Sequence, residues 1–406
     1  MSQHYDAVVI GAGPAGSTAA LLLASRGWSV LLVEAKAFPR RKVCGEYLSA
    51  TNAPLLRRLG IAEDFQQQAG PSVTRTAIFC GERAVTAALP ATDDCEGEPW
   101  GRALSRERLD LLLRDRAVVC GAEIAQPARC ESLVRAGDGF QCLLSVGGAK
   151  HVREVSASVA IAAHGSWEIG PLATERKRTP PRSSDLLAFK AHFRSAELPQ
   201  GLMPLLSFAD GYGGMTHCDD GRVSLSCCVR RSRVERLPRS RDVSAGDAVL
   251  GLLLESCPAL RPVLGRAELD GPWLSAGPIQ PGIRPRFRDG VFVIGNAAGE
   301  AHPVVAEGIS MAMQSAWLLC EQLARFEPAK IGEPERAVIG RRYAGEWRRA
   351  FGARLRAAAV IAALAMRPTL MKTVQPLLAA CPPLLTFGAR LSGKSTLVVR
   401  NDLSVA

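Results

Sequence analysis

A glycine-rich turn near the start of the chain carries the clearest chemistry in the sequence. The run GAGPAG at 11–16 follows an apolar stretch, YDAVVI at 5–10, and precedes an Ala/Leu-rich stretch at 17–26. In a strand–turn–helix unit this spacing binds the pyrophosphate of a dinucleotide, because the glycines permit a tight turn and the helix start presents free N–H groups. The residues expected to contact the dinucleotide here are Gly11, Gly13, Pro14, Ala15 and Gly16.

A carboxylate follows the next predicted strand, at the position where such folds bind a ribose. The stretch SVLLV at 29–33 ends at Glu34, and Ala35 comes next. Glu34 can accept both hydroxyls of an adenosine ribose, and its charge disfavours a phosphate on that ribose. The sequence therefore predicts an adenine dinucleotide without a 2′-phosphate, held by Glu34 and Ala35.

Four more segments carry polar, cationic or sulfur-bearing side chains, and three of the four also contain glycine. They are FPRRKVCGE at 38–46, SRERLD at 105–110, HGS at 164–166 after a predicted strand, and a long segment at 290–316. In the last of these, apolar residues 291–294 predict a strand and residues 307–323 predict a helix. The same order of strand, turn and helix thus recurs far along the chain.

Together these motifs resemble the flavoprotein superfamily that contains p-hydroxybenzoate hydroxylase and the geranylgeranyl reductases, over most of residues 1–325. The resemblance implies FAD as the cofactor. In that family the residue at the position of 296 binds the ribityl chain, and the helix start faces the pyrimidine edge of the flavin, where its dipole stabilises the reduced anion. The further FAD contacts that the resemblance implies are Arg41, Cys44, Gly45, Arg106, Gly165, Gly295, Asn296, Pro303, Glu307, Gly308 and Ile309.

Three positions depart from the family pattern. Asn296 and His164 stand where the family has aspartates, and Ala306 stands where glycine is usual. Asn296 keeps an acceptor for a ribityl hydroxyl without the charge. We interpret His164 as a satisfied turn residue rather than a catalytic one, and we expect Ala306 to shift the backbone under the flavin.

The elements predict an α/β fold in which a Rossmann-like FAD-binding domain is joined to a sheet-rich substrate domain and a C-terminal helical region. Alternating apolar and polar residues at 76–79 and 222–227 predict strands of the substrate domain, and proline-rich stretches at 178–182 and 277–285 predict linkers. The expected division is 1–72, 101–172 and 274–325 for the FAD-binding domain, 73–100 and 173–273 for the substrate domain, and 326–406 for the helical region.

The C-terminal region has two interpretations. From about 341 it has Arg-rich and Ala-rich faces typical of helices, which we interpret as a subdomain packed on the others. The alternative is a basic amphipathic surface that contacts a membrane or admits a lipid-like substrate. The run GARLSGKS at 388–395 matches a phosphate-binding loop, but that motif works only between a buried strand and a helix of a nucleotide-binding sheet. We therefore expect no ATP site there.

Composition narrows the class further. The chain has 406 residues, 47% of them hydrophobic, and 50 Lys and Arg against 39 Asp and Glu give a net charge of +11. Nucleic acid is not expected as a partner, because the arginines are spread along the chain and aromatics are only 5%. The 12 cysteines show no CxxC pair and no Cys/His metal spacing, which favours a reducing cytosol without a disulfide framework or metal site. No signal peptide or membrane span is predicted, so we expect a cytoplasmic protein with at most peripheral membrane contact.

The reaction is less well defined than the cofactor. The first hypothesis is a monooxygenase that uses O2 and a transient nicotinamide reductant, NADH or NADPH, to oxygenate a hydrophobic small molecule. The second is a reductase that saturates double bonds of a long isoprenoid or polyene. A flavin halogenase is disfavoured, because the family's G-W-x-W-x-I-P segment is missing, and a non-catalytic flavin-binding protein remains an alternative. The candidate catalytic residues are Cys44, Tyr212, His217 and His302.

Overall fold

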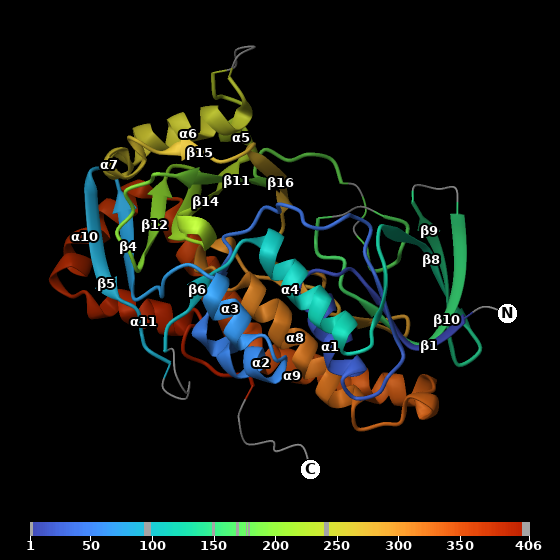
Figure 1. Cartoon of the computed structure of the whole chain (residues 1–406). Helices are drawn as coiled ribbons and strands as arrows, with labels where there is room; N and C mark the ends of the chain where they lie inside the picture. Colours follow the sequence, from blue (N-terminus) through green and yellow to red (C-terminus); the bar gives the residue numbers. More distant parts are fainter. Residues whose placement is uncertain are drawn as a thin grey trace.

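The computed structural model describes residues 3–92, 99–147, 151–167, 170–175, 177, 179–238 and 243–399. They form two large sheets side by side, with helices packed on them (Figure 1). The predicted fold class is confirmed: a Rossmann-like α/β unit, a sheet-rich second unit and C-terminal helices.

The first sheet has a parallel centre built from the apolar stretches that the sequence singled out. Its strand order is β18-β19-β10-β1-β2-β7, with the hairpin β8–β9 paired to β10. Near-continuous runs of Val, Ile, Leu and Ala make the central strands, because both faces are covered and neither needs polar residues. The bounds are β1 Gln3–Ile10, β2 Val30–Val33, β7 Glu123–Ala125, β8 Ala128–Ala136, β9 Gly139–Val146, β10 His151–Ala162, β18 Phe287–Arg288 and β19 Val291–Val293.

A layer of helices covers this sheet. Helix α1 (Pro14–Ala24) is buried along its whole length and packs between α4 (Arg106–Val119) and α8 (Gly308–Leu323). Its glycine and alanine residues let these neighbours approach closely. The short helices α2 (Ala53–Arg58) and α3 (Ala62–Gln68) lead from this unit toward the second sheet.

The second sheet has the order β15-β11-β14-β13-β12-β4-β5, with β16 paired to β11. Helix α6 (Ala245–Ser256) buries Val249 and Leu253 against one face. The other face looks toward the first unit and the C-terminal helices. The bounds are β4 Arg75–Cys80, β5 Arg83–Ala88, β11 Leu186–Arg194, β12 Leu202–Phe208, β13 Gly211–His217, β14 Val223–Arg230, β15 Glu268–Leu269 and β16 Leu274–Ile279.

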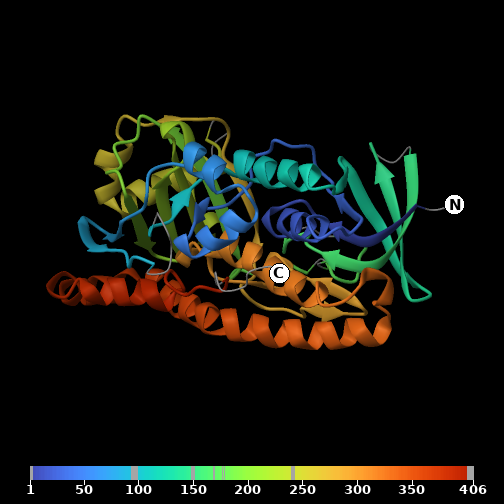
Figure 2. The same ribbon diagram turned by 60° about the horizontal axis from the view of Figure 1, so that its bottom comes forward.

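Three helices follow the second unit and tie the two sheets together. Helix α9 (Glu333–Ala365) runs along the bottom of the molecule (Figure 2). It contacts the first sheet through the hydroxyl of Tyr343, which donates to Val293 O, and the second sheet through the carbonyl of Ala365, which accepts from Ser207 of β12. Helices α10 (Pro368–Ala380) and α11 (Pro383–Leu391) continue beneath the second sheet. Among the described residues no single helix is long and apolar enough to cross a membrane; α9 and α10 pass that test only as a pair, bent by 105°.

The observed elements differ from the expected ones in two places. The helix expected from about 341 begins at Glu333, because Glu335 accepts from the N–H of Gly332 and starts the helix earlier. The expected linker at 277–285 contains the end of β16, which pairs with β11 of the second sheet although 274–325 was assigned to the FAD-binding domain. A register irregularity in this pairing accommodates Pro278 at the strand end.

Candidate cofactor and substrate site

Glycine turns from three distant segments meet at the carboxyl edge of the first sheet. Gly11, at φ +107°, lies so close to the end of β10 that an added Cβ would be 2.6 Å from Ala163 O. A Cβ added to Gly295, at φ +63°, would lie 2.9 Å from the Cβ of Ala15. A Cβ on Gly16 would lie 1.8 Å from Gly11 O, so Gly16 allows the helix to pack closely on the turn; it is not among the residues that line the cavity described next.

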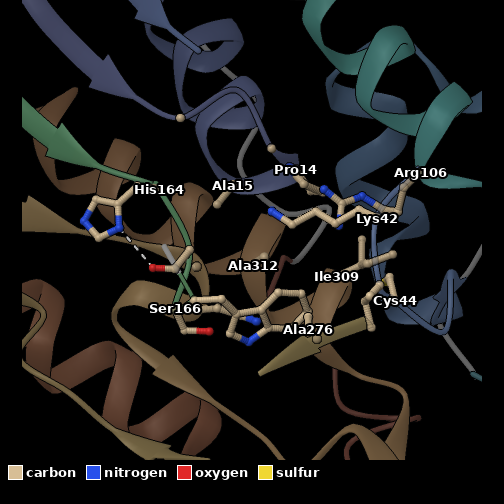
Figure 3. A pocket seen from close by; sticks show the side chains of 18 of the residues that line it. Pro14, Ala15, Lys42, Cys44, Arg106, His164, Ser166, Ala276, Ile309 and Ala312 are labelled. Carbon is tan, nitrogen blue, oxygen red and sulfur yellow. Dashed lines mark hydrogen bonds between the residues drawn. The ribbon is translucent and has the colours of Figure 1, made fainter. Parts of the chain in front are cut away.

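These turns surround a cavity of about 390 Å³ that reaches from β2 to the start of α8. Figure 3 shows Pro14 and Arg106 on one side of it and Cys44 and Ile309 nearby. The lining contains sixteen of the predicted cofactor contacts: Gly11, Gly13, Pro14, Ala15, Glu34, Ala35, Arg41, Cys44, Gly45, Arg106, Gly165, Gly295, Asn296, Pro303, Gly308 and Ile309. The structure therefore brings together residues spread over nearly three hundred positions of sequence.

Glu34 lies at the end of β2, nearly buried, and lines the cavity. Its Oε2 accepts from the N–H of Ala12 at 2.9 Å and its Oε1 accepts from the N–H of Lys36 at 3.0 Å. These bonds fix the carboxylate beside the glycine turn, where it can accept ribose hydroxyls.

Arg106 supplies a fixed positive charge opposite the start of α1. Its Nε and Nη2 donate to Asp110 at 2.8 and 2.7 Å, within the first turns of α4. Burial lowers the pKa of the guanidinium, but the Asp110 carboxylate outweighs this effect and raises the pKa overall. A Cβ on Gly13 would lie 3.6 Å from Arg106 Nη2. The absent side chain thus leaves space between the helix start and the guanidinium, as a pyrophosphate requires.

The cavity is also lined by cations that the sequence analysis did not predict as cofactor contacts. Arg40, Lys42 and Arg129 are among the lining residues, and Lys42 Nζ lies 5.9 Å from the ring centre of Trp167. Arg41, which was predicted, also lines the cavity, but its guanidinium pairs with Glu107 and Asp270. Lys42 could have been found from the sequence, because it lies inside the segment FPRRKVCG that already pointed to the cofactor.

A buried ionic network stands behind Cys44. Glu46 is 1% exposed, adopts φ 64°, and receives Lys190 Nζ, His192 Nε2 at 2.7 Å and the N–H of Arg106 at 3.0 Å. Burial alone would raise the pKa of Glu46. Lys190 and His192 outweigh this effect and lower the pKa to about 2. The network therefore holds segment 38–46 against both β11 and α4.

Part of this network has side chains of the types that bind metal ions, but a positive charge already occupies it. Ligand atoms of Glu46, His192 and Cys218 lie within 4.8 Å of one another. However, the Lys190 ammonium already contacts a Glu46 oxygen, and a second cation there would be repelled. We therefore interpret the cluster as structural.

The segment at 290–316 carries an acid that no sequence pattern indicated. Glu300 is 4% exposed and lines the cavity, and its carboxylate accepts from Asn296 Nδ2 at 3.4 Å, Trp167 Nε1 at 3.3 Å and Arg284 Nη2 at 3.4 Å. Burial raises the pKa of Glu300, and Arg284 only partly offsets this. Asn296 therefore stands beside a carboxylate four residues away instead of carrying one itself.

His164 lines the cavity but is satisfied locally. Its Nδ1 lies 3.0 Å from Gly165 O and its Nε2 lies 3.0 Å from Thr174 Oγ1, as Figure 3 shows for the first contact. The contacts agree with our interpretation of this residue as part of a turn. Gly165, at φ +85°, has open space where a side chain would be.

Two expectations for the segment before α8 need correction. Ala306 does not shift the backbone away from the glycine-like conformation: it adopts the left-handed conformation itself, with φ 54°. Glu307, expected to face the flavin, is not among the residues that line the cofactor cavity. It is fully buried and accepts from Lys394 Nζ at 3.1 Å. Its carboxylate is therefore paired with a buried ammonium from the C-terminal segment. Lys394 is the lysine of the run GARLSGKS, which is thereby explained as an internal ion pair.

A second cavity, of about 320 Å³, adjoins the first and is mostly apolar. Both cavities are lined by Val43, Cys44, Gly45, Trp167, Ser226, Pro303 and Ala306. From there the second cavity passes between β12, β13 and the C-terminal helices, past Leu205, Ile361, Met371 and Leu385. The arrangement offers a long, apolar space that begins beside the cofactor cavity.

The candidate catalytic residues separate into three groups. Cys44 lines both cavities. Tyr212 lines the apolar cavity, and its hydroxyl lies 3.1 Å from His302 Nδ1; burial raises the pKa of Tyr212 and lowers that of His302. His217 lines neither the cofactor cavity nor the apolar cavity, and it donates from Nε2 to Leu198 O at 2.7 Å. The structure brings the first two groups to the site and leaves His217 outside it.

The donor set of the cofactor cavity fits FAD. A ribose-binding carboxylate at Glu34, the space between Gly13 and Arg106 and the turn at 295–296 follow one another along the cavity. The start of α8 at Gly308 lies at its far end, where a helix dipole favours negative charge on a flavin ring.

Comparisons with known proteins agree with this fit. A profile of the FAD binding domain family matches residues 4–330. The chain is 27% identical over 368 residues to digeranylgeranylglycerophospholipid reductase 1 of Methanopyrus kandleri, covering 86% of this chain and 87% of that protein. Its fold is similar to a flavin-dependent brominase (TM-score 0.74, 21% identity, 97% and 94% of the two chains). It is also similar to a geranylgeranyl bacteriochlorophyll reductase-like protein of Thermoplasma acidophilum (TM-score 0.64, 17% identity, 100% and 94%).

Proposed function

Because the chain belongs to the FAD binding domain family and is an FAD-dependent oxidoreductase, we propose that it reduces carbon–carbon double bonds in a long isoprenoid-like substrate. The sequence favoured a monooxygenase over such a reductase. Our proposal reverses this order on account of the apolar cavity.

The apolar cavity is the observation that carries the proposal. It shares Cys44 and Ala306 with the cofactor cavity and extends past Ile361 and Leu385. Its lining of Leu, Ile, Val and Met side chains favours a flexible hydrocarbon over a compact polar substrate. The full-length similarity to a digeranylgeranylglycerophospholipid reductase supports the same substrate class.

The reaction requires a hydride for one alkene carbon and a proton for the other. Bound FAD, once reduced by NADH or NADPH, would supply the hydride, and the oxidised nicotinamide would leave. Glu34, Arg106 and Asn296 would hold the cofactor. Cys44 stands at the junction of the cavities and is our candidate for delivering the proton from its thiol, while the apolar walls exclude water from the reacting carbons.

Oxygenation or halogenation is the second candidate function. The fold similarity to a flavin-dependent brominase favours it, but that likeness concerns the fold alone. A peroxide-type reaction would need O2, and halogenation would also need a halide.

One assay separates these functions. The FAD-loaded protein is reduced with NADPH or dithionite without oxygen and then given a geranylgeranyl lipid in detergent. Mass spectrometry should show the gain of two hydrogens per reduced double bond. Product that forms only after oxygen is admitted and carries an oxygen or halogen atom would instead overturn the reductase proposal.

A pair of neighbouring substitutions tests the role of the apolar cavity. Ile361 lines it, whereas Val360, one residue earlier on α9, is 60% exposed. Ile361→Trp should fill part of the cavity and lower kcat/KM for a long substrate about tenfold or more, while Val360→Trp should leave it unchanged. Equal rates for both variants and the unaltered protein, measured in detergent, would show that the substrate does not use this cavity.

A further inference from the structure

The outer face of the C-terminal helices carries a band of exposed apolar side chains. Figures 1 and 2 both place α10, α11 and the end of α9 at the end of the molecule far from the N-terminus. Leu377 of α10 is 59% exposed and Phe387 of α11 is 58% exposed. The band consists of Leu364, Leu370, Leu377, Leu384, Phe387 and Leu391. Within α10 and within α11 these residues are three, four or seven positions apart and so share one side of each helix. Exposed apolar groups gathered in this way indicate an interaction surface.

The charge of the same region has a single sign. The sequence contains no Asp or Glu from 347 to 401. Four cations are exposed on these helices or in the link between them: Arg356 of α9, Arg367 after α9, Lys372 of α10 and Arg390 of α11. A surface that combines apolar side chains with cations, and has no anions of its own, is complementary to a bilayer with anionic headgroups.

The apolar cavity reaches the surface within this band. Leu364, Leu370 and Leu384 line the cavity, and they are also 37%, 40% and 42% exposed. Each comes from a different helix, α9, α10 or α11. The same three side chains therefore belong both to the wall of the cavity and to the exposed surface, where α10 turns away from α9 by 105°.

We propose that α10, α11 and the end of α9 dock onto an anionic lipid bilayer, so that a membrane-resident substrate enters the apolar cavity between Leu364, Leu370 and Leu384. The identity of the substrate rests on the proposed function, whereas the docking rests on the surface itself. Residues Leu377 and Phe387 insert into the headgroup boundary, and the four cations contact lipid phosphates.

Vesicle co-sedimentation of the full-length, FAD-loaded protein tests the docking. Vesicles of phosphatidylcholine alone are compared with vesicles that also contain phosphatidylglycerol. At low salt the protein should bind the anionic vesicles at least about tenfold more tightly, and high salt should weaken this preference. Failure to bind the anionic vesicles, or equal binding to both kinds at low salt, would overturn the proposal.

Matched variants locate the surface. The double substitution Leu377→Glu and Phe387→Glu should reduce binding to anionic vesicles about tenfold or more. Val119→Glu is the control, because Val119 of α4 is 73% exposed and lies outside the band. Retained flavin absorbance verifies the fold of each variant. Equal loss in the control and the double variant would refute the assignment of the surface, as would self-association through this face in the absence of vesicles.

Failure of the docking and failure of the proposed function give different results. Reduction of a detergent-dispersed lipid without vesicle binding would overturn the docking alone. Vesicle binding without reduction of any alkene would support the docking and count against the proposed function.

Discussion

The cofactor cavity and the apolar cavity meet at Cys44, yet different parts of the chain build them by different means. The first is formed by backbone turns, at Gly11, Gly13 and Gly295, in which an added Cβ would meet backbone or side-chain atoms, and by buried charges such as Glu34 and Arg106. The second is formed by apolar side chains of strands and of three C-terminal helices.

This difference has consequences for tolerance to change. Backbone turns that touch each other cannot move apart without losing the cofactor geometry, whereas apolar walls can repack when the volume of one side chain changes. A cofactor of fixed shape suits the first kind of construction, and flexible hydrocarbon chains suit the second. Substitutions in the two cavities should therefore differ in the size of their effects.

Gly16→Ala should give the largest effect. Its Cβ would lie 1.8 Å from Gly11 O, where neither backbone can yield, so we expect a loss of about 5 kcal/mol or more in the free energy of unfolding. Flavin content after purification and urea unfolding measure this. Gly251→Ala in α6 is the control, because nothing lies within 4 Å of its Cβ and alanine favours a helix by up to about 1 kcal/mol. If Gly16→Ala keeps its flavin and stability, the first cavity is not as rigid as we infer.

Glu46→Gln should follow. It leaves Lys190, which is 0% exposed, without its counter-charge, at a cost of about 3–5 kcal/mol in the free energy of unfolding. Glu63→Gln, on the exposed first turn of α3, should change it by less than about 0.5 kcal/mol. Urea unfolding of both variants at neutral pH provides the comparison, and similar values for the two would mean that the network does not stabilise the fold.

The same residue predicts a dependence on pH. Because the pKa of Glu46 is lowered from 4.5 to about 2 in the folded chain, its contribution to stability is present above pH 4.5 and is lost as the pH falls toward 2. The difference in unfolding free energy between the unaltered protein and Glu46→Gln should therefore shrink over this interval. A difference that stays constant down to the lowest pH at which both fold would contradict the assigned ionisation.

Sequence patterns predicted the turns better than the side-chain networks, for a physical reason. A glycine turn between a strand and a helix is a local requirement, so Gly11, Gly13 and Glu34 could be placed from spacing alone. The partners of Glu46 are Lys190 and His192, which come from a strand far along the chain. No local pattern connects them, because only the pairing of the second sheet brings them to the cofactor segment.

The C-terminal region shows the same limit. Its helices follow from composition, but the cavity wall that they form depends on the bend between α9 and α10. The pairing of Lys394 with Glu307 was hidden in a run that resembles a phosphate loop. Likewise, Tyr212 and His302 were each named from their own segments, and their contact of 3.1 Å follows from the packing of β13 against the loop before α8.

Ala306→Gly should give the smallest effect, and it has the opposite sign. Ala306 lies where the two cavities meet and holds φ 54°, a conformation that costs an alanine about 1 kcal/mol more than a glycine. Part of this gain is offset by the greater freedom of glycine in the unfolded chain, so we expect stabilisation by about 0.5 kcal/mol. Ala298→Gly, at φ −83°, should instead destabilise by about 0.5–1 kcal/mol. Thermal unfolding of the two variants measures the contrast. Destabilisation by both would mean that the left-handed turn is not strained. The junction of the cavities would then tolerate a side chain as readily as the apolar walls do.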